Sequence, residues 1–156
     1  MTLALLGADK KLAVGAFAPD VEGQDLAGHL LRLSDLKGRM AVVYFYPKDE
    51  TPGCTKEACA FRDAFEKFQA AGVEIFGVSR DTPESHRKFQ EHHKLLFYLV
   101  ADPSGKVCDA YGVRSALRLA ERVTFLVGPD RRVRYVWLGV NPALHAEEVL
   151  AKAQEK

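Results

Sequence analysis

The chain has 156 residues, of which 47% are hydrophobic and 28% are charged, with a formal net charge of +1 at pH 7. This length and composition fit one globular domain over residues 1–156 with a sizeable core, and they exclude a disordered chain. Since the charge is close to zero and no apolar run approaches the ~20 residues of a membrane span, we expect neither nucleic acid nor membrane as a partner.

The cysteine count bears on the compartment. The chain has three cysteines, and an odd number argues against a fully paired disulfide framework. It fits a reducing compartment, so we expect a cytoplasmic protein. The N-terminal Met1–Gly7 holds only a short apolar run with no basic segment before it, which does not fit a signal peptide.

Turn-forming residues dominate the stretch over residues 11–39. Within it, Leu31 and Leu33 alternate with Arg32, which predicts a short strand in a hairpin. The following residues, 34–38, predict a one-turn connection into the next strand.

A strand followed sharply by a helix comes next. Met40–Tyr46 is a continuous apolar run, typical of a buried strand. Thr51 followed by Pro52 predicts a helix start, with Thr51 as the N-cap and proline at the first helical position. Gly72 predicts the end of this helix. Apolar residues recur along it at spacings of three and four: Ala58, Phe61, Phe65 and Phe68.

The second half of the chain alternates strands with helices and then adds a hairpin and a helix. Strands are expected at Val73–Ser79 and Phe97–Ala101, and a hairpin is expected from Arg122–Val127 and Val133–Leu138. Helices are expected from Thr82-Pro83 to His93, over Lys106–Tyr111, and from Asn141-Pro142 to about Ala153. This order predicts an α/β sandwich, a central sheet flanked by helices.

Cys54 occupies the corner between the first long strand and its helix. It falls on the third helical residue, at the edge of the sheet where α/β proteins place their chemistry. A thiolate there is favoured by free backbone N–H groups and by the positive end of the helix dipole. Such surroundings lower a thiol pKa and raise its reactivity. Taken alone, the position leaves open an inert, buried thiol.

Cys59 lies five residues further along the same expected helix. Helical geometry then separates the two Cα atoms by ~8.6 Å, beyond the ~7 Å that a disulfide tolerates. Cys54 and Cys59 can therefore bond only if the start of the helix unwinds. Thiols that are apart when reduced and meet after local unfolding suit a catalytic cycle better than a structural disulfide.

These residues resemble a known active-site motif. Pro47-x-x-x-Thr51-x-x-Cys54 is similar to the peroxiredoxin motif. With the neighbouring Phe45–Asp49 and with Cys59, the segment resembles the peroxiredoxin Q group, also called bacterioferritin comigratory protein. The resemblance covers most of the chain, and it implies a thioredoxin-like fold with a central mixed sheet and an N-terminal β-hairpin extension.

The resemblance also implies an activity. The protein is expected to be a thiol-dependent peroxidase that reduces hydrogen peroxide and organic hydroperoxides through a sulfenic acid on Cys54. Cys59 is expected to resolve this acid as an intramolecular disulfide, as in atypical 2-Cys peroxiredoxins. Thioredoxin or a similar dithiol then restores the thiols. A monomer that serves in antioxidant defence is expected, with no cofactor and no metal.

Supporting site residues follow from the same resemblance. In the family, an arginine before a Thr-Phe pair contacts the reactive sulfur, and Arg122 holds that place; an exposed strand-end charge is the alternative. Its rigid fork of donors suits a thiolate and peroxide oxygens. Thr51 is expected to contribute its hydroxyl, and Pro47 to shield the sulfur from water. We interpret Glu57 as a solvated helix residue.

Other conspicuous residues are interpreted as structural. Tyr44 and Tyr46 are predicted to pack in the core. Cys108 is predicted to be a buried thiol, with a backup resolving role left open. His92 and His93 are adjacent on one helix, so they are expected to point to different faces and to form a poor metal pair.

Two rival functions remain to be weighed. A dithiol oxidoreductase would carry Cys-x-x-Cys, whereas Cys54 and Cys59 are separated by four residues. A metal-binding module that used both cysteines and a histidine would need shorter ligand spacings and a fourth ligand. Residues 113–121 look shorter than the matching loop of many relatives, which leaves the substrate preference open.

Overall fold

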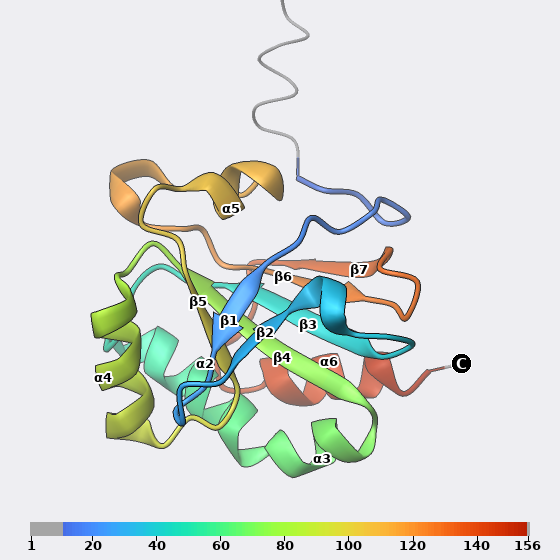
Figure 1. The fold of residues 1–156 in the computed structure, drawn as a ribbon, viewed down its shortest axis with the longest axis horizontal. Coiled ribbons are helices and arrows are strands. Elements are labelled where there is room, and N and C mark those ends of the chain that lie inside the picture. The colour runs from blue at the N-terminus through green and yellow to red at the C-terminus, as the bar shows by residue number, and fades with distance from the viewer. Residues whose placement is uncertain (1–10, 156) are drawn as a thin grey trace, which may run out of the picture.

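The computed structural model describes residues 11–155, so the interpretation of Met1–Gly7 lies outside it (Figure 1). The strands are β1 (Glu22–Gln24), β2 (Leu30–Arg32), β3 (Met40–Phe45), β4 (Val73–Ser79), β5 (Tyr98–Ala101), β6 (Val123–Val127) and β7 (Val133–Leu138). The α-helices are α2 (Pro52–Asp63), α3 (Phe65–Ala70), α4 (Pro83–His93), α5 (Lys106–Ala110) and α6 (His145–Ala153), with 3-10 turns at Leu33–Asp35 and Ala116–Arg118. No helix in this range is long and apolar enough to cross a membrane.

The described strands form a seven-stranded mixed sheet in the order β2-β1-β5-β4-β3-β6-β7. β3, β4 and β5 run parallel to one another, whereas β6 and β7 at one side and β1 and β2 at the other are antiparallel to their neighbours. The expected central mixed sheet with flanking helices is therefore confirmed.

The expected N-terminal hairpin is also confirmed, and it extends the sheet. β1 pairs with β2 and, through Gln24 opposite Leu99, with β5. Gly23 permits this close approach, because a Cβ at that position would lie 2.7 Å from Tyr98 Cβ. The hairpin thus covers the edge of β5, which would otherwise present unpaired backbone groups.

The sheet separates two apolar layers. Along β3, Val42 and Tyr44 pack into one layer, while Val43 and Phe45 pack into the other, as the two-residue period of a strand requires. α2, α3, α4 and α6 contribute to the first layer, and α5 contributes to the second (Figure 1). Because both faces of β3 are covered, nearly all its residues are apolar, and this explains the continuous apolar run in the sequence.

Two helix boundaries differ from expectation. The helix predicted to run to Gly72 breaks at Ala64, whose φ of −95° and ψ of 4° leave the helical region. Phe61 and Phe68 are buried on either side of the break, with their rings 5.7 Å apart. The apolar spacing looks the same with or without this break, so periodicity alone could not reveal it.

The last helix begins at His145 and not at Asn141-Pro142. Asn141 Oδ1 accepts a hydrogen bond from the Ala143 N–H, and its carbonyl accepts one from the Leu144 N–H. These bonds build a turn, a structure that asparagine stabilises in competition with a helix start. α6 therefore starts one turn later than its sequence signal.

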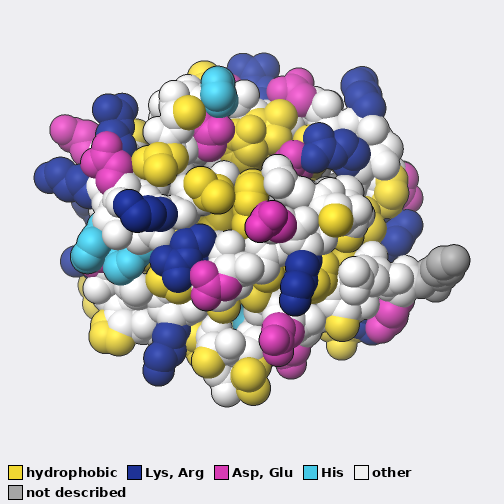
Figure 2. Space-filling view, turned by 90° about the horizontal axis from the view of Figure 1, so that it is seen from below, with side chains coloured by type: hydrophobic (Ala, Val, Ile, Leu, Met, Phe, Trp, Pro, Cys, Tyr) yellow, Lys and Arg dark blue, Asp and Glu magenta, His cyan; other side chains and the backbone are white. Residues whose placement is uncertain are grey.

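Charged side chains of both signs are interspersed on the face shown in Figure 2, which views the molecule from below. The formal net charge of +1 agrees with this mixture. A surface with no large field of one sign gives no electrostatic reason to expect a nucleic acid on this face.

Candidate active site

Cys54 lies at the start of α2, on the face of the sheet that carries four helices. Thr51 is the N-cap residue with extended dihedral angles, Pro52 is the first helical residue, and Cys54 is the third. The Cys54 side chain is 1% exposed and belongs to the apolar layer. The structure thus places this thiol where the sequence predicted it, at a helix N-terminus and largely shielded from water.

Arg122 lies beside Cys54 although the two residues are 68 positions apart in the chain. β3 and β6 pair antiparallel, with Phe45 opposite Val123, so the residue before β6 lies beside the turn that follows β3. From there, Arg122 Nη2 donates to Cys54 Sγ over 3.4 Å. The predicted proximity is present, although β6 begins one residue after Arg122.

Glu57 is the site residue that the sequence reasoning misread. The expectation of a solvated helix residue is wrong, because Glu57 is fully buried one turn after Cys54. Its Oε1 accepts a hydrogen bond from Arg122 Nη1 at 2.5 Å. Burial raises the pKa of Glu57 to about 7, while the charge and hydrogen bond of Arg122 oppose that rise. Helical spacing alone cannot show that Arg122, the residue before β6, covers this helix position.

The Arg122 guanidinium contacts both Glu57 and Cys54. Nη1 bonds to Glu57 and Nη2 faces Cys54, so one planar fork bridges the two side chains. Burial lowers the pKa of Arg122, but the charges of Glu57 and Cys54 outweigh it and raise the pKa overall. Gly53 leaves room for this fork, because a Cβ there would lie 3.2 Å from Arg122 Nη2.

Thr51 and Pro47 frame the turn before α2. The predicted side-chain cap by Thr51 does not form: its hydroxyl donates to the Lys48 carbonyl at 2.7 Å, and the backbone alone has N-cap geometry. By contrast, Thr82 caps α4 by accepting from the Ser85 N–H. The Thr51 oxygen keeps lone pairs for a further donor. Pro47 is half-buried at the end of β3.

Tyr44 and Tyr46 are buried as predicted, each 1% exposed. Burial raises the pKa of Tyr44 well above its ordinary value, and the charges of Glu57 and Cys54 add to the rise. Within the described part of the chain, the Tyr44 hydroxyl and Glu57 Oε2 are buried without a hydrogen-bond partner. The buried carboxylate therefore has one unsatisfied oxygen of its own, and the Tyr44 hydroxyl is a second unsatisfied polar atom.

A buried polar network anchors the turn through Asp49, which sequence reasoning did not single out. Asp49 accepts hydrogen bonds from the Tyr46 hydroxyl at 2.7 Å and from the Ser85 hydroxyl at 2.8 Å. Its backbone N–H donates to Asp81, at 2.8 Å. Burial raises the pKa of Asp49 to about 6. The only sequence signal was its place within the motif segment.

The other two cysteines differ sharply in setting. Cys59 is half-buried in the continuous helix α2, and all three cysteines are free. Cys108 is fully buried, and the burial together with the nearby Asp102 carboxylate raises its pKa to about 12. The prediction that Cys108 is a buried thiol is confirmed. A thiol in that state is a poor nucleophile.

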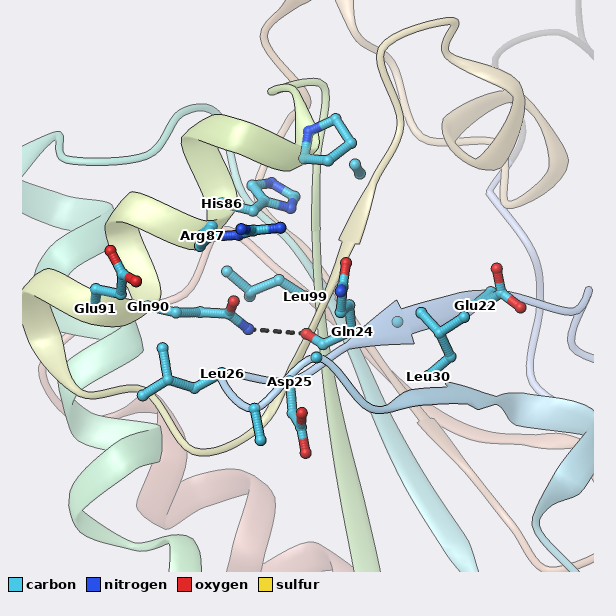
Figure 3. A pocket seen from close by; sticks show the side chains of 15 residues that line it. Glu22, Gln24, Asp25, Leu26, Leu30, His86, Arg87, Gln90, Glu91 and Leu99 are labelled. Carbon is cyan, nitrogen blue, oxygen red and sulfur yellow. Dashed lines mark hydrogen bonds between the residues drawn. The ribbon is translucent and has the colours of Figure 1, made fainter.

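A pocket of about 400 Å³ lies between α4 and the β1–β2 hairpin (Figure 3). None of the five expected site residues lines it. Gln90 reaches across to β1, where its amide nitrogen donates to the Gln24 carbonyl at 2.8 Å. The chemistry-bearing side chains gather at Cys54 and not in this pocket.

Two groups of side chains among residues 11–155 bring metal-ligand atoms within 4.8 Å of one another: Glu50, His92 and His93, and Asp49, Asp81 and His86. Neither group contains a cysteine, so the structure does not assemble the cysteine–histidine site of the rival metal module. The expectation that His92 and His93 point to different faces is wrong, because both rings contact Glu50.

Comparison with known proteins shows which family this chain belongs to. A match to the AhpC/TSA family covers residues 14–136, and the chain belongs to this family. Its relatives are peroxiredoxins of the Q or bcp group. Peroxiredoxin Q, chloroplastic, of Sedum lineare is 43% identical over 147 residues, which cover 92% of this chain and 79% of the relative. Peroxiredoxin Q, chloroplastic, of Oryza sativa subsp. japonica is 43% identical over 143 residues. The match covers 90% of this chain and 66% of that relative.

Solved structures support the same grouping. Peroxidoxin BcpB from Mycobacterium tuberculosis superposes with a TM-score of 0.82 at 35% identity, over 92% of this chain and 97% of that one. A cysteine-to-serine variant of PrxQ from Xylella fastidiosa superposes with a TM-score of 0.82 at 32% identity, over 92% and 96% of the two chains. The predicted thioredoxin-like fold and the resemblance to the peroxiredoxin Q group are confirmed.

Proposed function

We propose that this protein is a thiol peroxidase that reduces hydrogen peroxide and organic hydroperoxides at Cys54. The observation that carries the proposal is the contact of Arg122 Nη2 with Cys54 Sγ, 3.4 Å long, beside a helix N-terminus. The names of the relatives, peroxiredoxin Q and peroxidoxin, support the same chemistry.

In the first step the Cys54 thiolate attacks the terminal oxygen of the peroxide. The S–O bond forms as the O–O bond breaks, and the departing alkoxide or hydroxide takes a proton to leave as alcohol or water. Arg122 holds the oxygens and disperses the charge that develops as the O–O bond breaks, because its donors are fixed beside the sulfur. The Thr51 hydroxyl donates its hydrogen to the Lys48 carbonyl, so its oxygen accepts a hydrogen bond from the peroxide O–H. Cys54 becomes a sulfenic acid.

In the second step Cys59 resolves the sulfenic acid. Its thiol condenses with Cys54 to form a disulfide, and the sulfenic oxygen leaves as water. Both residues lie in the unbroken helix α2, so the first turns of α2 must unwind before the sulfurs meet. A dithiol reductant, for which we propose thioredoxin, then restores both thiols by exchange.

Anaerobic treatment of the reduced protein with one equivalent of hydrogen peroxide, followed by mass spectrometry of the cysteines, tests this scheme. We expect a Cys54–Cys59 disulfide and an unmodified Cys108. Cys59→Ser should stop at the Cys54 sulfenic acid, and Cys54→Ser should consume no peroxide. Cys108→Ser is the matched control and should behave as the parent.

Three results would contradict the scheme. Peroxide consumption by Cys54→Ser at the parental rate would remove Cys54 from the chemistry. Normal cycling of Cys59→Ser with thioredoxin would show that Cys59 does not resolve the sulfenic acid. Reduction of a protein disulfide by the thiols without any reaction with peroxide would favour the rival dithiol oxidoreductase.

A further inference from the structure

The structure brings Glu50, His92 and His93 together beside the candidate active site but outside it. Glu50 belongs to the turn between β3 and α2, and the two histidines are the last two residues of α4. His92 Nδ1 lies 3.0 Å from Glu50 Oε1, and His93 Nε2 lies 2.9 Å from the same oxygen. All three ligand-type atoms lie within 4.8 Å of one another.

The two histidines converge on Glu50 at the C-terminal end of α4. Lys94, the C-cap residue, turns into the left-handed region with φ 52° and ψ 50°. The two imidazole rings lie side by side, with centroids 4.0 Å apart. Histidine side chains gather at the edge of the molecule on the side of α4, at the left of Figure 2. Adjacent helix residues usually diverge, but here both rings incline toward the same carboxylate.

Glu50 adopts a backbone conformation that side chains rarely take. Its φ is 65°, in the left-handed region, which is unfavourable for a residue other than glycine. The buried hydrogen bonds of Asp49, next to it in the chain, fix the turn in this form. The carboxylate of Glu50 is thereby held against the end of α4 by the fold.

We propose that Glu50, His92 and His93 form a binding site for one divalent transition-metal ion, such as Zn²⁺. Two imidazole nitrogens and a carboxylate oxygen are a donor set that zinc accepts in proteins. Zinc bonds of about 2.0–2.1 Å in a tetrahedron place ligand atoms about 3.3 Å apart. The observed 2.9 and 3.0 Å separations reach that spacing with small side-chain rotations.

The exposure of the site sets its character. The side chains of Glu50 and His92 are 44% and 65% exposed, whereas that of His93 is 17% exposed. Three protein ligands leave a fourth position for water, as in sites that are open to solvent. Glu84 and Lys88 line the adjoining hollow together with Glu50, and their opposite charges offset each other.

An ordinary carboxylate–histidine pair is the competing explanation, and the chain supplies one for comparison. His29 Nδ1 lies 3.1 Å from Asp25 Oδ2, also at the surface, but with a single imidazole. A surface pair of this kind contributes little to stability and needs no second histidine. The second imidazole at Glu50 is what distinguishes a metal site from such a pair.

Calorimetric titration of Zn²⁺ into the untagged full-length protein tests the proposal. Cys54→Ser/Cys59→Ser protein is used, so that thiols do not compete for zinc, and circular dichroism confirms that each variant is folded. We expect binding of one ion. Glu50→Gln, His92→Ala and His93→Ala should each weaken it by about tenfold or more, because each removes one of three ligands.

His29→Ala is the matched control and should bind zinc as the parent does. The proposal is overturned by the absence of saturable binding at one equivalent, or by binding that survives all three ligand substitutions unchanged. An equal loss of affinity in His29→Ala would also overturn it, by showing general histidine binding. Because no peroxide is used, the outcome does not depend on the proposed peroxidase function.

Discussion

Glu57 Oε1 lies 2.5 Å from Arg122 Nη1, and this contact joins a fully buried carboxylate to the guanidinium that touches Cys54. Glu57 and Arg122 are 65 residues apart in the chain. Burying a carboxylate is costly unless a cation accompanies it. Each residue of the pair therefore depends on the other. Glu57 orients the Arg122 guanidinium, and the guanidinium faces the Cys54 sulfur.

Removing the Glu57 carboxylate should weaken the reaction with peroxide. In Glu57→Ala, Arg122 loses its anchor, and we expect sulfenic acid formation to slow about tenfold or more. Glu57→Gln should lose less, because its amide oxygen still accepts from Nη1. Single-turnover kinetics with hydrogen peroxide measure both rates. Exposed Glu66, on the neighbouring helix α3, gives the control Glu66→Ala, which should react as the parent. Parental rates in Glu57→Ala would mean that Arg122 orients itself without this carboxylate.

Stability should depend on pH through Glu57. Burial raises its pKa to about 7 from an ordinary value of 4.5, against the opposing effect of Arg122. Between these pH values the folded protein keeps a proton that the unfolded chain has released. The contribution of Glu57 to the free energy of unfolding is therefore full below about 4.5 and declines as the pH rises to about 7.

The measurement compares the parent with Glu57→Gln, because other buried groups titrate in the same range. Burial raises the pKa of Asp49 to about 6 and so acts in the same direction, whereas burial lowers the pKa of His86 to about 4 and acts in the opposite one. Subtracting the two denaturation curves at each pH removes both effects. The parent should lose stability relative to Glu57→Gln from pH 4.5 to 7. A constant difference would refute the assignment.

Arg122→Lys should be a poor substitute. A lysine ammonium is a single point charge, so it cannot contact Glu57 and Cys54 at once as the two arms of the guanidinium do. We expect the second-order rate with peroxide to fall about 100-fold, while the fold is retained. Arg118→Lys, at an exposed position, is the control. Reactivity within twofold of the parent would remove Arg122 from the site.

Oxidation should open only the start of α2. The Cys54–Cys59 disulfide requires unwinding, but Phe61 resists it, because its ring packs against Tyr44, Phe68, Phe97 and His145. We expect faster amide hydrogen exchange over residues 52–61 in the oxidised form, with β3 and β4 unchanged. A small disulfide loop recovers little entropy, so the oxidised form should also be less stable. Equal protection of residues 54–61 in both redox forms would rule out the unwinding step.

Local signals in the sequence determined the strand β3, the start of helix α2 and the position of Cys54. The apolar run of β3 and the Thr51-Pro52 helix start depend on neighbouring residues only, and they placed Cys54 at the third position of α2. The ~8.6 Å separation of the Cys54 and Cys59 Cα atoms follows from their five-residue spacing and helix geometry alone. These features could be predicted because a buried strand and a helix start each depend on a few adjacent residues.

Only the tertiary structure decided what surrounds the sulfur. Antiparallel pairing of β6 with β3 carries Arg122 to Cys54 across 68 residues, and the same contact buries Glu57, whose spacing along the helix gave no sign of it. The end of α4 likewise meets Glu50 through the packing of helix against loop. The burial and charge environment of a side chain depend on which distant segments cover it. Helical periodicity does not identify those segments, because it reflects only the spacing of residues within one helix.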